Sequence, residues 1–377
     1  MPGPVYEIGV AAVDEDPRVA VFSEAISELV ADLGADRFAS VTIKRVEDLA
    51  LEVPTVAVIL WDDELADDRL LSRVDSIRTQ GVTVLPVVRS TTAIANLPKA
   101  LTAINAMSWD NDGRQVARAC LRELGLHESS RGVFISHRRA DGLIVAEQLF
   151  EAFSKSGWRP FVDRFAIDAG ADVQDRIEES MEEAAFLLLV ESPDASTSPW
   201  VQYEVLYALE RHLGLAIVNI NDAPKFPATA DLPRHRLVHP THLNGTHIVL
   251  AKDAVDEVVE LVETMHAIAL ARRRRQLLVS AMTAARAAGR NVEAAPGWRL
   301  HVRQGDGAEL LGVLPHLPVP NDLYEIDMAR NDIDSAVLVH AAHVIDERRR
   351  RILNWVVGER PIELVPNNAI GARWAGG

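Results

Sequence analysis

The sequence predicts an α/β protein built from three units, and three observations support this. Its 377 residues, 48% hydrophobic and 25% charged, are enough for two or three globular domains. Short runs of branched aliphatic residues alternate with amphipathic helical stretches, a pattern typical of parallel sheets covered by helices. A turn-rich stretch at 125–131 and a change from acidic to basic composition after residue 270 divide the chain into three units. They comprise residues 1–127, 131–270 and 271–377.

In the N-terminal unit, residues 1–127, predicted strands alternate with predicted helices. Apolar runs predict strands at 7–13, 55–61 and 82–88, and a 3.6-residue apolar period predicts a helix over 19–33. A helix over 112–124 closes the unit. We therefore expect a parallel sheet here.

The central unit, residues 131–270, repeats the pattern more clearly. Its apolar runs predict strands, and the polar-apolar stretches between them predict helices. The strands are expected at 132–136, 159–162, 185–190 and 215–220, and the helices over 142–156, 173–183 and 199–211. A loop rich in proline and histidine at 221–240 then precedes a last strand at 247–250 and a last helix at 254–270.

The C-terminal unit, residues 271–377, shows for a third time the spacing of strand, helix and strand seen in the first two units. Strands are predicted at 336–340 and 361–365, separated by a helix through residue 348, whereas the Gly- and Pro-rich stretch 295–320 predicts no element. Any α/β chain can show such recurring strand–helix–strand patterns by chance, so the patterns favour an α/β fold without establishing an internal repeat.

Composition narrows the function classes. The net charge of −16 is divided as −9, −10 and +3 over residues 1–130, 131–270 and 271–377, and an acidic body repels nucleic acid. Arginine runs at 272–275 and 348–351 are interpreted as solvated helix faces or inter-domain ion-pair partners. The single Cys120 excludes an internal disulfide and favours the reducing cytoplasm, and the apolar runs are too short to span a bilayer.

Four segments of the central unit lie in an informative order. They are the strand 132–136 followed by His137, the stretch Gly-Trp-Arg-Pro-Phe-Val-Asp at 157–163, the turn at 168–170 leading to 177–181, and Ser-Pro-Asp-Ala-Ser-Thr-Ser-Pro-Trp-Val-Gln-Tyr-Glu at 192–204. Together they resemble the TIR (Toll/interleukin-1 receptor) domain family in its bacterial form, over about residues 131–270.

The resemblance implies a flavodoxin-like sheet of five parallel strands, and the N-terminal unit is interpreted as a degenerate TIR-like domain. It implies TIR–TIR contacts through a loop at about 163–172, and hence a homo-oligomer. Enzymatic members hydrolyse NAD at the nicotinamide–ribose bond with a glutamate preceded by a tryptophan, a pair that Glu204 and Trp200 match. The resemblance therefore implies that NAD is the substrate and that no cofactor or metal is needed. The functions of related bacterial TIR proteins suggest a role in antiphage defence. The alternative is a non-enzymatic TIR scaffold or adaptor.

The residues around Glu204 support a site on their own. Ser198 before Pro199 is a good helix start, and Trp200 and Glu204 share one helix face at i and i+4. A preceding strand puts the pair at the carboxyl edge of the sheet, where open α/β folds bind ligands. Because nicotinamide leaves as a neutral molecule, one carboxylate beside the developing ribosyl cation is sufficient. Trp200 either offers an aromatic wall to the substrate or packs the core.

Further candidate substrate-binding residues follow the first two strands of this unit. Ser136, His137 and Arg138 offer hydroxyl, imidazole and guanidinium groups to phosphate or ribose oxygens, while Phe165 and Asp168 lie in the expected contact loop.

Rival chemistries are less consistent with the residues. A receiver domain needs acidic residues where Ser136, His137 and Arg138 stand, and no GxxxxGK[ST] loop occurs. The histidines at 235, 239, 242 and 247 match no metal-site pattern. A nucleoside deoxyribosyltransferase-like enzyme remains a rival, because it also uses a glutamate on an N-glycosidic bond, as a covalent nucleophile.

Overall fold

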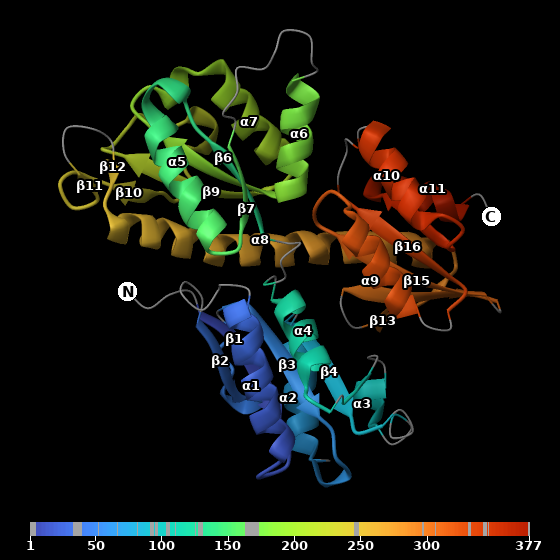
Figure 1. Cartoon of the computed structure of the whole chain (residues 1–377). Coiled ribbons are helices and arrows are strands. Elements are labelled where there is room, and N and C mark those ends of the chain that lie inside the picture. The colour runs from blue at the N-terminus through green and yellow to red at the C-terminus, as the bar shows by residue number, and fades with distance from the viewer. Residues whose placement is uncertain are drawn as a thin grey trace.

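The described residues form three five-stranded sheets, a two-stranded sheet, the helices that cover them and one long helix that all three units share (Figure 1). The computed structural model describes residues 5–32, 40–51, 53–65, 67–80, 82–90, 94, 97–102, 106–109, 111–124, 126, 131–162, 173–244, 249–295, 298–305, 307–330, 333–341, 345 and 347–375. Among these residues, no helix combines the length and apolar character needed to cross a bilayer.

The N-terminal unit forms a parallel sheet with the strand order β2-β1-β3-β4-β5. Apolar side chains from both faces of its strands form two cores. Helices α1 and α4 contribute to one core and α2 to the other, which places helices on both faces of the sheet. The strands are β1 (Val5–Ala11), β2 (Ser40–Arg45), β3 (Thr55–Leu60), β4 (Thr83–Val88) and β5 (Met107–Ser108), and the helices α1 (Pro17–Asp32), α2 (Asp68–Thr79), α3 (Lys99–Thr102) and α4 (Arg114–Glu123).

The central unit forms a parallel sheet with the order β10-β9-β8-β6-β7. Counted from its first strand, this is the 2-1-3-4-5 order of flavodoxin-like folds, and the N-terminal sheet has the same order. The strands are β6 (Gly132–Ser136), β7 (Arg159–Val162), β8 (Phe186–Glu191), β9 (Gly214–Ile220) and β10 (His235–Leu237). One face of the sheet is covered by α5 (Arg139–Lys155) and by the long helix α8 (Lys252–Ala287). The other face is covered by α6 (Val173–Ala184) and α7 (Pro199–Glu210).

The fifth strand of the central sheet differs from the prediction. It is β10, inside the predicted loop 221–240, where buried Leu237 lies in the core beside β9. The predicted last strand 247–250 is wrong as a member of this sheet. Its described part, β12 (Val249–Leu250), pairs antiparallel with β11 (Leu243–Asn244) instead.

The predicted helix 254–270 is part of a much longer helix, α8 (Lys252–Ala287). No glycine or proline interrupts this stretch, so nothing in the backbone ends the helix at 270. Its apolar side chains enter all three units: Val258 lies in a core of the central unit, Ala267 in one of the N-terminal unit and Ala281 in one of the C-terminal unit. Figure 1 shows α8 running between the N-terminal and central units and ending in the C-terminal unit.

The C-terminal unit has a mixed sheet in sequence order, β13-β14-β15-β16-β17, with β13 to β15 antiparallel and β15 to β17 parallel. The stretch 295–320, which predicted no element, supplies the hairpin of β14 and β15, with Gly305 in the left-handed region at its turn. The elements are β13 (Asn291–Ala295), β14 (Arg299–Gln304), β15 (Gly307–Leu314), α9 (Pro320–Arg330), β16 (Ser335–His340), α10 (Glu347–Val357), β17 (Ile362–Pro366) and α11 (Ile370–Ala375).

One residue of each arginine run pairs with α6, and the pairs of Arg349 join the C-terminal unit to the central unit, one of the two interpretations drawn from the sequence. Arg349 on α10 bonds Glu179 and Glu183 on α6, at 2.5 and 2.6 Å. Buried Arg273 on α8 lies 3.4 Å from the carboxylate of buried Glu182, also on α6. The contacts of Arg349 dock α10 of the C-terminal unit on α6 of the central unit.

Candidate functional site

The candidate site lies at the carboxyl ends of β6 and β8. Ser136 is the last residue of β6, and the segment after β8 leads directly into α7. As predicted, the Ser198 hydroxyl caps α7 by accepting from the Val201 amide at 3.4 Å, and Pro199 is the first helical residue. The start of α7 is therefore fixed at this edge of the sheet.

The central contact of the site joins Ser136 and Glu204. The Ser136 hydroxyl donates a 2.5 Å hydrogen bond to Glu204 Oε2. Ser136 is 1% exposed and Glu204 5% exposed, so the carboxylate lies beneath the surface, one turn inside α7. A bond from a hydroxyl to a carboxylate is strong and directional, and it fixes the carboxylate at the end of β6.

Trp200 and Glu204 occupy different depths of the same helix. The Trp200 side chain is 56% exposed on the first turn of α7, whereas Glu204 is buried one turn later. Of the two roles considered for Trp200, packing in the core is therefore wrong. An indole exposed beside a buried carboxylate is free to contact a ligand.

His137 and Arg138 follow Ser136 but make different contacts. His137 is buried, with Nδ1 3.3 Å from the Ile135 carbonyl oxygen. Arg138 lies 3.3 Å from Asp141 and 3.5 Å from Asp194. Its charge is thus already engaged by carboxylates at the ends of β6 and β8.

Asp141 is a residue of this edge that the sequence did not single out. Its carboxylate accepts from the Ser192 hydroxyl and from the Asp194 amide, both at 2.9 Å, and so ties the start of α5 to the segment after β8. Gly142 allows this approach, because a Cβ there would lie 3.3 Å from the His137 Cβ. The signal in the sequence was an acidic residue in the first helical turn after the first strand.

Phe165 and Asp168 lie outside the described residues, as does the whole of the expected contact loop 163–172. Strand β7, which precedes these residues, ends at Val162, and Val162 pairs with Ile135 near the carboxyl end of β6.

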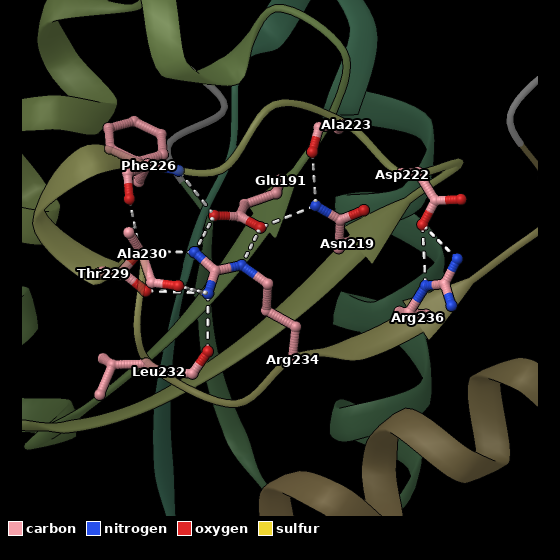
Figure 2. A network of polar contacts seen from close by, with 10 residues as sticks. All are labelled: Glu191, Asn219, Asp222, Ala223, Phe226, Thr229, Ala230, Leu232, Arg234 and Arg236. Atoms are coloured by element: carbon pink, nitrogen blue, oxygen red, sulfur yellow. Dashed lines mark hydrogen bonds and ion pairs between the residues drawn. The ribbon is translucent and has the colours of Figure 1, made fainter.

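A second polar group, missed from the sequence, closes the carboxyl ends of β8 and β9. Figure 2 shows buried Glu191 bonded to Arg234 at 2.7 and 2.9 Å, to the Asn219 amide at 2.8 Å and to the Phe226 backbone N–H at 3.0 Å. Arg234 also donates to the carbonyl oxygens of nearby loop residues, among them Thr229 at 2.8 Å. Both carboxylate oxygens are used within the protein, so this group holds the loop to the sheet. A lone glutamate ending an apolar strand was its signal.

Two pockets lined by described residues lie away from Glu204. One, of about 150 Å³, is at the amino ends of β6 and β7, beside Gly132 and Arg159. The other, of about 160 Å³, lies between the central and C-terminal units.

The histidine-rich loop is organised by a carboxylate. His235 Nε2 lies 3.2 Å and His242 Nε2 3.7 Å from Glu257 on α8, while His247 is outside the described residues. Within the described part of the chain, no group of three or more His, Cys, Asp or Glu side chains is arranged to hold a metal ion.

The helix of the N-terminal sheet that corresponds to α7 lacks such a carboxylate. This helix is α2, which follows the third strand of its sheet as α7 does, and its inward-facing Leu70 and Val74 are buried in an apolar core. The N-terminal unit thus has the strand order of the central unit without its polar pair.

Comparison with known proteins agrees with the geometry of the central unit. A model of the TIR domain family matches residues 133–284, which extends past residue 270 along α8. No curated protein matches the chain. The parallel five-stranded sheet and the family match agree that residues 133–284 form a TIR domain.

Proposed function

We propose that the TIR domain hydrolyses NAD at the nicotinamide–ribose bond, with Glu204 as the catalytic carboxylate. The observation that carries the proposal is the position of Glu204, buried at the carboxyl end of β6 and held by Ser136, with exposed Trp200 one turn away. The TIR family includes NAD-hydrolysing members, and an N-glycosidic bond of this kind needs only one carboxylate.

The reaction explains why one acidic residue suffices. The C–N bond breaks with its electron pair moving to the pyridinium nitrogen, so nicotinamide departs neutral and needs no proton from the enzyme. Positive charge builds on the ribose carbon and ring oxygen, and a fixed carboxylate stabilises this charge more than it stabilises the ground state. Water then adds to the ribose carbon and releases one proton, giving ADP-ribose.

The neighbours of Glu204 have separate roles in this proposal. Ser136 positions the carboxylate, and Trp200 offers an aromatic face to the nicotinamide ring. His137, Phe165 and Asp168 are proposed to contact the substrate. Arg138 binds its diphosphate by exchanging the carboxylate partners Asp141 and Asp194 for phosphate oxygens.

Assembly is proposed to control the activity. Strand β7 ends at Val162, which pairs with Ile135 on β6, so contacts between copies through residues 163–172 would bear directly on the site. The N- and C-terminal units, which both pack on α8, would then govern how copies come together. Depletion of NAD by an assembled form fits a cytoplasmic role in antiphage defence.

The test is NAD loss by the purified full chain, measured by mass spectrometry of the products at several protein concentrations. Glu204→Ala and Glu204→Gln are expected to lose at least about 100-fold in turnover, since each removes the negative charge at the ribosyl cation. Glu210→Gln is the matched control, because Glu210 is an exposed glutamate on the same helix.

Two outcomes would overturn parts of the proposal. Equal NAD loss by the wild type and both Glu204 variants would remove Glu204 from the chemistry, and no loss at any concentration would leave a TIR module that acts by contacts alone. A glycosyl–enzyme adduct trapped on Glu204 would instead identify a covalent transferase mechanism.

A further inference from the structure

The pocket between the TIR domain and the C-terminal unit has the properties of a ligand site. It lies where the parallel strands β16 and β17 end, the edge at which open α/β sheets bind ligands, and α7 and α8 of the TIR domain form its opposite wall. Its lining residues are Arg211, His212, Arg273, Gln276, Leu277, Ala341, Pro366, Asn367 and Asn368. Two are arginines and none is acidic.

Three buried polar atoms of this lining lack a hydrogen-bond partner among the described residues. They are Arg273 Nη1, Arg211 Nε and Asn367 Oδ1. Buried polar groups are almost always paired, because leaving one unpaired costs about 1–3 kcal/mol. Three such atoms around one pocket indicate that a bound group completes them.

The Arg273 charge is only partly compensated within the protein. The Arg273 side chain is 7% exposed, and its Nη2 lies 3.4 Å from Glu182, which also accepts a hydrogen bond from the Tyr207 hydroxyl at 3.1 Å. Burial lowers the pKa of Arg273, and the neighbouring carboxylate offsets this only in part. An anion in the pocket would supply the missing negative charge.

We propose that this pocket binds a phosphorylated sugar, with the phosphate on Arg211 and Arg273 and a sugar hydroxyl donating to Asn367. Guanidinium N–H groups match phosphate oxygens in geometry and charge, and the unpaired Asn367 carbonyl oxygen requires a hydrogen-bond donor, which a sugar hydroxyl supplies. A volume of about 160 Å³ holds a phosphate with part of a sugar, so the rest of a larger ligand, such as a nucleotide, extends into solvent.

The ligand would hold two parts of the molecule together. Arg211 directly follows α7 and Arg273 lies on α8, whereas Asn367 and Asn368 follow β17 of the C-terminal unit. Binding therefore bridges the C-terminal unit and the helix that carries Glu204. The site is independent of the proposed NAD hydrolysis and can be tested without it.

The experiment is isothermal titration calorimetry of the full chain with ribose 5-phosphate, inorganic phosphate and ribose. We expect saturable binding of ribose 5-phosphate, weaker binding of inorganic phosphate and none of ribose. Asn368→Asp changes an exposed amide into a carboxylate of the same shape and is expected to weaken binding about tenfold, as is Arg211→Gln. Arg272→Gln is the matched control, because it removes an exposed arginine from α8 next to the pocket residue Arg273.

Each result decides the proposal. Unchanged affinity in Arg272→Gln and in Glu204→Ala, together with the loss in Asn368→Asp, supports the pocket as the site. No saturable binding of either phosphate compound in the millimolar range overturns it, as does equal affinity in Asn368→Asp, Arg211→Gln and the wild type. Tighter binding of inorganic phosphate than of ribose 5-phosphate would overturn the role of Asn367.

Discussion

Replacing Glu263 with glutamine tests whether a buried ion pair on α8 holds the N-terminal unit to the TIR domain. Glu263 is 2% exposed and pairs with Arg131, which is fully buried just before β6. Its carboxylate also accepts from the Trp158 indole at 3.1 Å, and the Tyr6 hydroxyl shares its proton between Glu263 Oε1 at 3.3 Å and the Glu263 backbone carbonyl oxygen at 3.0 Å. Tyr6 lies on β1, so one carboxylate joins both units.

The expected magnitude follows from these contacts. Oε1 accepts from Arg131 Nη1 at 2.8 Å and from Tyr6, while Oε2 accepts from Arg131 Nη2 at 3.1 Å and from Trp158. A glutamine amide keeps only one acceptor oxygen, so two of these four hydrogen bonds are lost. The amide NH2 group, itself a donor, then faces the donor groups that the second carboxylate oxygen had accepted from. The Arg131 charge is left buried without a counter-charge, and this combination costs about 3–5 kcal/mol.

The assay is urea unfolding of the full chain at pH 7, followed by circular dichroism and tryptophan fluorescence. Glu263→Gln should shift the first unfolding transition by the stated free energy, whereas Glu260→Gln, half-buried one turn earlier on α8, should stay within about 0.5 kcal/mol of wild type. Tyr6→Phe should couple to Glu263→Gln in a double-mutant cycle. A loss below about 1 kcal/mol in Glu263→Gln would refute the idea that this ion pair joins the two units.

Three further predictions concern the site, acid stability and assembly. Ser136→Ala should lower NAD turnover about tenfold, because Glu204 loses the hydroxyl that orients it; unaltered turnover would contradict this role. Burial raises the pKa of Asp16, but the hydrogen bonds and charge of Arg18 outweigh it and lower the pKa overall. This stabilisation is present above pH about 4 and lost as the pH falls through the folded pKa, so Asp16→Asn should destabilise by about 1–3 kcal/mol at pH 7 and by progressively less as the pH falls below about 4, measured by thermal unfolding. Asp168→Ala should reduce light scattering and NAD turnover together; a change in one alone would separate assembly from catalysis.

The strands of the TIR sheet were largely predictable because their sequences are locally unambiguous. The strands at 132–136 and 159–162 were predicted with the observed bounds, since each is a short apolar run between turn signals. Strand β10 was missed because it has three residues in a Pro- and His-rich segment, and only Leu237 among them is buried. Its pairing with β9 is a tertiary contact without a local pattern.

The sequence predicted which residues form the candidate site better than it predicted the contacts between them. Helix capping by Ser198 and the i, i+4 spacing placed Trp200 and Glu204 on α7, but the hydrogen bond from Ser136 joins residues 68 positions apart. The pocket beside Arg273 was not predictable from the sequence, because two units must pack together before its walls meet. The charged run at 272–275 was taken as the start of a new unit, whereas it continues a helix.

Helix α8 joins the TIR domain to the C-terminal unit without an intervening loop. Each helical residue advances about 1.5 Å and turns about 100° around the axis. Inserting or deleting one residue between Leu270 and Leu277, which belong to opposite ends of this connection, would swing the whole C-terminal unit through that angle. Arg349 would then be carried away from Glu179 and Glu183 although every side chain is intact, so the residue count of this stretch sets the mutual orientation of the two units.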